Sequence, residues 1–138
     1  MNSKAVALQA RTRSFAKRVI TLCEGLPATA AADSIRDQLL RSSGSVDSNY
    51  RAACRARTTK EFIAKIGIVV EDADESLGWL ELLIETSICT TDEAKELADE
   101  ANQLVAIFVQ SEKTAKRNYE AQLARRRAMV QRKVARRR

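Results

Sequence analysis

Two apolar patterns with a helical period follow each other between residues 35 and 84, and they restrict the chain to few folds. In each pattern, apolar or small residues recur at steps of three and four, which places them on one face of a helix. The first face comprises Ile35, Leu39, Ser42, Val46, Asn49 and Ala53. The second comprises Phe62, Ile66, Val69, Ala73, Leu77, Leu80 and Ile84. We therefore expect two long helices in immediate succession.

The junction between these two patterns carries a helix-start signal. Thr58 and Glu61 have the spacing of a capping box, in which the Thr58 hydroxyl accepts from the Glu61 amide and the Glu61 carboxylate accepts from the Thr58 amide. A link this short makes the two helices antiparallel neighbours.

Similar patterns occur on both sides of this pair. Before it, a helix ends at Gly25, which can take the left-handed cap conformation, and at Pro27, which cannot continue a helix. The apolar face of that helix comprises Val6, Leu8, Phe15, Val19, Leu22 and Leu26. Thr29 then caps the next helix. After the pair, residues 90–93 form a second capping box ahead of a last stripe, which comprises Ala94, Leu97, Ala101, Leu104, Val105, Phe108, Ala115 and Tyr119.

The sequence thus predicts an all-α protein, an antiparallel up-down four-helix bundle in one domain over residues 1–119. The expected helices span about 4–25, 29–57, 59–88 and 91–119. Residues 42–45 are four poor helix formers, and we expect either a close approach of a neighbouring helix or a kink there.

The same stretch carries a resemblance to a known family. The residues that carry it read QLLRS-x-x-SV-x-x-NYRAACRAR over 38–57 and EFIAKIGIV-x-EDADES-x-x-WLELL over 61–83, and the match extends from Phe15 to about Leu83. They resemble the four-helix-bundle proteins encoded by intervening sequences of bacterial 23S ribosomal RNA genes. The resemblance implies a small helical protein that forms a ring-shaped homopentamer and binds nucleic acid, with no established catalysis.

The chemistry of the side chains argues against an enzyme. The chain has no His, which removes the commonest general base, the His-based triads and the Glu-x-x-His sites of di-iron bundles. The carboxylates of residues 71–75 lack the partners of a metal site, so we expect Glu71 and Glu75 to pair with Arg51 or Arg55. We predict no catalytic residue, metal, cofactor or small-molecule substrate.

The three cysteines, Cys23, Cys54 and Cys89, are widely spaced and odd in number, which fits neither a disulfide framework nor a zinc motif. They are expected to be free thiols in a reducing cytoplasm. No segment approaches the roughly 20 apolar residues that span a bilayer, so we expect a soluble protein without membrane contact.

Charge is strongly segregated along the chain. Residues 113–138 hold eleven Lys or Arg and one acid, a net charge of +10, whereas residues 60–112 hold three bases and thirteen acids, a net charge of −10. Eight of the eleven C-terminal bases are Arg, whose guanidinium fork suits bidentate contacts with phosphate.

The Arg-rich segment 120–138 is either a disordered, solvated end or a basic helix that continues the last helix of the bundle. No aromatic residue follows Tyr119, which favours sequence-tolerant binding of RNA or DNA through backbone phosphates. The expected phosphate-binding residues are Lys116, Arg117, Arg125, Arg126, Arg127, Arg132, Lys133, Arg136, Arg137 and Arg138. In the alternative interpretation, the chain is an assembly protein whose acidic third and fourth helices bind a protein partner.

Overall fold

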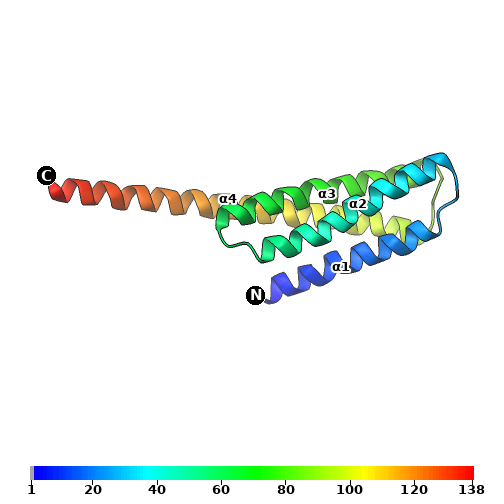
Figure 1. Cartoon of the computed structure of the whole chain (residues 1–138), viewed down its shortest axis with the longest axis horizontal. Helices are drawn as coiled ribbons and strands as arrows, with labels where there is room; N and C mark the ends of the chain where they lie inside the picture. The colour runs from blue at the N-terminus through cyan, green and yellow to red at the C-terminus, as the bar shows by residue number, and fades with distance from the viewer. Residues whose placement is uncertain (1) are drawn as a thin grey trace.

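The structure, a computed structural model, describes residues 2–138 and consists of four helices joined by short links. α1 spans Ser3–Glu24, α2 Ala30–Cys54, α3 Thr59–Glu85 and α4 Asp92–Arg137. Figure 1 shows the helices side by side, alternating in direction, with α4 continuing far beyond the other three. Residues 2–138 contain no strand. The predicted all-α four-helix architecture is confirmed.

The core lies where the apolar faces of the four helices meet. α2 packs extensively on α3 and α3 on α4, whereas α1 packs mainly on α2 and touches α4 over a smaller area. The large side chains with an exposed fraction of 1% or less include Phe15, Leu39, Ile66, Leu80 and Phe108, so every helix contributes to one core. These residues all belong to the periodic faces that the sequence displays.

Capping of α3 follows the sequence prediction in one half and departs from it in the other. The Thr58 hydroxyl accepts a hydrogen bond from the Glu61 amide at 3.0 Å, as expected. The Glu61 carboxylate accepts from the amide of Arg57 at 3.4 Å, and not from that of Thr58 as predicted. Glu61 therefore ties the link before α3 to the first turn of the helix.

The prediction of a second capping box was wrong in its register. Thr91 caps α4 by accepting from the Ala94 amide at 3.2 Å, one residue later than the expected Thr90–Glu93 pair. The carboxylate of Glu93 is bonded instead to Arg18 on α1. At the end of α1, Gly25 adopts a right-handed conformation with φ of −91°, so a left-handed cap was also wrong there. Thr29 caps α2 as predicted.

The run of poor helix formers in α2 is a site of close helix packing. α2 is unbroken from Ala30 to Cys54. Ser42 and Ser76 are fully buried, and their hydroxyl groups are 2.8 Å apart across the α2–α3 contact. The Ser45 hydroxyl donates to Asp72 at 2.5 Å one turn further along. The small side chains allow α3 to approach closely, and the interhelical hydrogen bonds satisfy their buried hydroxyl groups.

In residues 2–138, no helix has both the length and the apolar character required to cross a membrane.

Candidate nucleic-acid interface

α4 has a second half that leaves the bundle. The helix is 46 residues long, about 69 Å at 1.5 Å per residue. Its last buried residue is Phe108, and Asn118 is the last of its residues to line a groove shared with the start of α1. Residues 120–137, here called the α4 extension, project from the end of the bundle that also holds the N-terminus and the α2–α3 link (Figure 1).

The basic residues expected to bind phosphate all lie on the solvent-exposed surface. All ten are classed as exposed: Lys116, Arg117, Arg125, Arg126, Arg127, Arg132, Lys133, Arg136, Arg137 and Arg138. Among them, the one ion pair within the described residues joins Lys116 to Glu112 at 3.7 Å. The other nine cations have no acidic partner in that part of the chain, so their charge is available to a polyanion.

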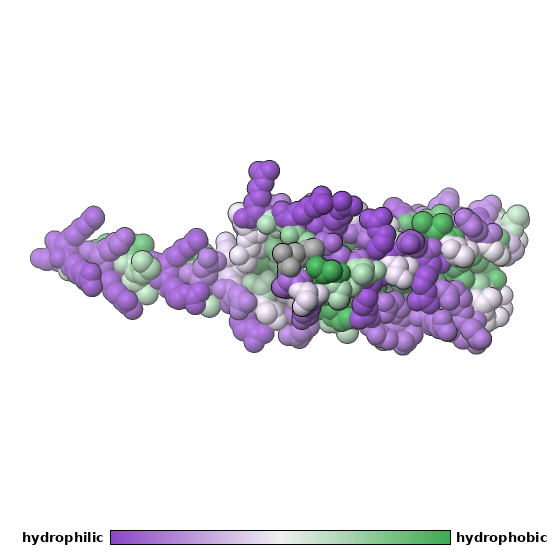
Figure 2. All heavy atoms as spheres, turned by 90° about the horizontal axis from the view of Figure 1, so that it is seen from below, coloured by the Kyte–Doolittle hydropathy of each residue, from purple (hydrophilic) through white to green (hydrophobic). Residues whose placement is uncertain are grey.

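The α4 extension also has a narrow apolar edge. Leu123 and Val130 line a shallow depression together with Arg126 and Arg127, and Val134 continues the row with an exposed fraction of 48%. Figure 2 shows this surface as largely hydrophilic with small apolar patches between the charged groups. The edge is too narrow to bury a core of its own, so the helix presents mainly charge.

The arginines of the bundle before residue 50 behave differently, because each of them has a carboxylate partner. Arg11 pairs with Glu100 at 2.5 Å and Arg18 with Glu93 at 2.9 Å, which join α1 to α4. The hydrogen bond from Arg18 lowers the pKa of the Glu93 carboxyl and is matched by a raised pKa of Arg18. The remaining pairs are Arg13–Asp47, Arg36–Asp33, Arg41–Asp72 and Arg41–Glu75.

The predicted pairing of Glu71 and Glu75 with Arg51 or Arg55 was wrong. Glu75 pairs with Arg41, and Glu71 makes no ion pair within residues 2–138. The antiparallel register explains the difference, because residue 42 lies opposite residue 76 and residue 45 opposite residue 72. Arg51 and Arg55 are therefore too far along α2 to reach the acidic stretch of α3.

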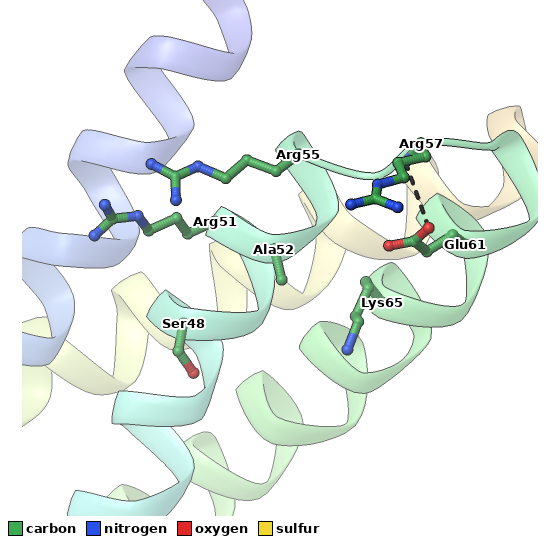
Figure 3. Close-up of a pocket in the computed structure, with 7 residues that line it drawn as sticks. All are labelled: Ser48, Arg51, Ala52, Arg55, Arg57, Glu61 and Lys65. Carbon is green, nitrogen blue, oxygen red and sulfur yellow. Dashed lines mark hydrogen bonds between the residues drawn. The ribbon is translucent and has the colours of Figure 1, made fainter.

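Arg51 and Arg55 instead border a basic depression at the end of the bundle. This depression has a volume of about 550 Å³ and is lined by Ser48, Arg51, Ala52, Arg55, Arg57, Glu61 and Lys65. Figure 3 shows Arg51 and Arg55 projecting side by side from consecutive turns of α2, with Arg57, Glu61 and Lys65 on the link and α3. We call this set of residues the basic depression.

Sequence patterns did not single out Arg57 and Lys65 as site residues. The available signal was a group of five bases around the α2–α3 link, Arg51, Arg55, Arg57, Lys60 and Lys65, with one acid, Glu61, among them. That signal becomes specific only when the fold brings the end of α2 and the start of α3 together.

The other polar groups of the described residues include the cysteines and the tryptophan of the bundle. No group of three His, Cys, Asp or Glu side chains there is placed to hold a metal ion. Burial raises the pKa of the Cys23 thiol to about 11, so it remains protonated and unreactive at neutral pH. The indole N–H of Trp79 on α3 is buried and has no hydrogen-bond partner within residues 2–138.

Comparison with solved structures finds a protein with a similar fold. A protein of unknown function from the S23 ribosomal protein family of Bacteroides thetaiotaomicron matches with a TM-score of 0.70 and 28% sequence identity. The match covers 97% of that chain and 76% of this one. A search of curated proteins gives no significant match.

The family model of the 23S rRNA-intervening sequence protein matches residues 4–110. This range contains the whole of α1, α2 and α3 except Ser3, together with the buried part of α4. It ends before the basic residues 113–138, so the α4 extension is an addition to the part that the family shares. The chain therefore belongs to the 23S rRNA-intervening sequence protein family.

Proposed function

We propose that this protein binds RNA or DNA through the backbone phosphates, without catalysis, and that the α4 extension is its main contact. The protein works in the cytoplasm as a homo-oligomer, a homopentamer by resemblance to its family. One observation carries the proposal: every arginine before residue 50 has a carboxylate partner, and none from Arg51 onward has one within the described residues.

This division is informative because exposed arginines in a chain with eighteen acids could readily have been paired. Instead, eleven arginines have no acidic partner in the described residues. Eight of them lie within residues 113–138, where no side chain is buried. A projecting helix of this kind can lie along a nucleic-acid backbone and release condensed counterions.

Chemistry favours the backbone over the bases as the binding target. The extension has no aromatic side chain on which bases could stack, and all of its arginines are exposed to solvent. Arg forms bidentate hydrogen bonds with phosphate oxygens, which every sequence offers equally. Binding should therefore tolerate changes of sequence and depend strongly on salt. In an assembly of five copies, five extensions would add polyvalence.

The test is fluorescence anisotropy with a labelled oligonucleotide of mixed sequence. We expect the full chain to bind duplex DNA with a log-log salt slope of roughly −4 to −5 if about five phosphates are contacted. A chain that ends at Tyr119 retains every buried residue, and we expect it to lose on the order of 100-fold in affinity at low salt.

A matched control separates the position of the charges from their number. The full-length variant Arg125→Gln/Arg126→Gln removes two charges from the extension, and Lys17→Gln/Lys95→Gln removes two exposed charges from the body. Weaker binding by the first variant alone supports the proposal. Equal affinity of the full and shortened chains would overturn it.

A specific observation also favours the alternative, an assembly protein with a protein partner. The outer face of α3 combines Asp74, Glu81 and Glu85 with the exposed side chain of Leu82. A basic, partly apolar helix fits such a surface, and the acidic face of α3 and α4 would then be its binding site.

Light scattering on protein freed of nucleic acid tests this alternative. A mass of several copies that falls to one copy in the Leu82→Lys variant, and in the chain ending at Tyr119, would favour binding of the extension by the acidic face. A mass that is unchanged by both changes would contradict it.

A further inference from the structure

We infer that the basic depression at the α2–α3 link is a second phosphate-binding site, which holds the backbone of the same nucleic-acid strand where it leaves the α4 extension. This inference rests on the proposed function and adds a site within the body of the bundle. It concerns Arg51, Arg55, Arg57 and Lys65, which line one depression. In Figure 3 the guanidinium groups of Arg51 and Arg55 point together to one side of it, and Arg57 and Lys65 lie on the other side.

The basic depression carries a strongly positive charge. Four cationic side chains line it and one acid, Glu61, so it carries a net charge of +3. In the described part of the chain none of these four side chains takes part in an ion pair. A bound anion would offset this positive charge.

The register of α2 against α3 leaves this end of their contact poor in acids. The acids of α3 at positions 72 and 75 lie opposite positions 41 and 45 of α2, where Arg41 and Ser45 bind them. Nearer the link, the part of α3 that faces Arg51 and Arg55 carries Glu61 as its one acid. The fold thus neutralises one end of the α2–α3 contact and leaves the other end basic.

The groups that line the depression are hydrogen-bond donors suited to phosphate. Arg51 and Arg55 are four residues apart on one helix face, so their guanidinium groups can hold a phosphate from two sides or contact consecutive phosphates. Ser48 adds a hydroxyl group one turn earlier. The depression also lies at the start of α3, whose dipole favours negative charge at that end.

The depression lies at the same end of the bundle as the α4 extension. The α2–α3 link lies at the end of the bundle from which α4 projects (Figure 1). On α4, the carboxylate of Glu112 packs next to Gly67 of α3, two residues after Lys65, so α4 passes close to this part of α3. The basic depression and the start of the α4 extension therefore lie at the same end of the molecule, where one strand can contact both.

Glu61 gives the site a prediction of opposite sign. Its carboxylate accepts from the Arg57 amide and is the one negative group in the depression. Glu61→Gln keeps an acceptor oxygen for the Arg57 amide and removes the charge. We expect it to strengthen binding of an oligonucleotide about two- to threefold, whereas removal of a cation weakens binding.

The experiment measures anisotropy of a labelled 20-nucleotide single-stranded RNA with the full chain. We expect Arg51→Gln/Arg55→Gln to weaken binding roughly tenfold at low salt and to reduce the salt slope by one to two. The matched control Lys17→Gln/Lys95→Gln removes the same charge from exposed positions elsewhere and should change affinity less than twofold. Equal effects of the two double variants would overturn the inference.

A second readout reports on the depression itself and does not depend on the arginine variants folding. Acetylation of lysines, followed by mass spectrometry, should show Lys65 protected when the RNA is bound and Lys17 unchanged. Protection of Lys65 by inorganic phosphate alone, with none by RNA, would identify a free-anion site and contradict the inference. No protection by RNA would also contradict it.

Failure of the site and failure of the proposed function give different results. If the chain ending at Tyr119 binds as well as the full chain but Arg51→Gln/Arg55→Gln weakens both, the depression is the main site and the role of the extension is wrong. If the shortened chain loses affinity and the double variant matches its control, the extension binds alone and the depression is not a site.

Discussion

One helix, α4, contains two regions that differ in almost every physical property. Residues 92–112 hold six acids and one base and bury Ala94, Leu97, Ala101, Leu104 and Phe108 in the core. Residues 113–138 hold eleven bases and one acid, and none of their side chains is buried. The backbone is helical in both, so the difference lies entirely in what the side chains contact.

This difference separates stability from binding. The first half is held by packing, and its acids pair with Arg11 and Arg18 of α1. The second half is held by helix propensity, by continuity with the first half and by the favourable position of Arg136 and Arg137 near the helix C-terminus. Changes in the first half should therefore unfold the protein, and changes in the second half should leave the fold intact.

Proline substitutions give the largest expected contrast between the halves. Ala101→Pro removes a backbone hydrogen bond inside the packed core, costs about 3 kcal/mol or more, and should prevent stable folding. Ala124→Pro breaks the helix in the exposed extension and should leave the midpoint of thermal unfolding of the bundle within 1–2 °C of the original, at about the precision of such measurements.

Circular dichroism measures both the midpoint and the loss of helix, and hydrogen exchange locates that loss. In Ala124→Pro, amides after residue 124 should exchange fast while those of α1 to α3 stay protected. Global unfolding of Ala124→Pro would show that the extension contributes to the stability of the bundle.

Truncation of single side chains gives the next contrast. Phe108 is fully buried and its ring lies 4.8 Å from that of Tyr50, so Phe108→Ala should reduce the free energy of unfolding by about 3–5 kcal/mol. Val130 is 61% exposed, and Val130→Ala should change it by less than about 0.5 kcal/mol. Urea unfolding measures both; a large loss in Val130→Ala would mean that the apolar edge of the extension is covered in solution.

The sequence was sufficient to predict the four helices because their apolar residues recur with one period. Phe15, Leu39, Ile66 and Leu104 all belong to predicted faces, and all are fully or almost fully buried. Helix ends were less predictable: Thr58 caps α3 as expected, but Thr91 rather than Thr90 caps α4. Several Thr and acidic residues adjoin there, and the ion pair of Glu93 with Arg18, a tertiary contact, decides between them.

Partners across helices could not be predicted from composition. The choice between Arg41 and Arg51 as partner of Glu75 depends on the axial offset of α2 and α3, which the length of the link and the close packing of Ser42 on Ser76 determine. For the same reason the basic depression was missed, since Arg57 and Lys65 join Arg51 and Arg55 only in the folded chain. The exposed arginines of α4 needed no tertiary information.

The smallest contrast concerns two glutamates, one in each half of α4. Arg18 lowers the pKa of Glu93 below its ordinary value of 4.5, so the ionised form is favoured in the folded state. The stabilisation is fully present above pH 4.5 and is lost as the pH falls through the lowered pKa. Glu93→Gln should therefore lower the unfolding midpoint slightly at pH 7 and leave it unchanged near pH 2.

Glu120→Gln, which removes the same charge from the extension, should have no effect on the midpoint at either pH, because Glu120 has no ion pair among the described residues. Thermal melts of both variants at the two pH values measure this contrast. If both glutamates shifted the midpoint equally at pH 7, overall charge and not the α1–α4 ion pair would be the cause, and the two halves of α4 would be electrostatically alike.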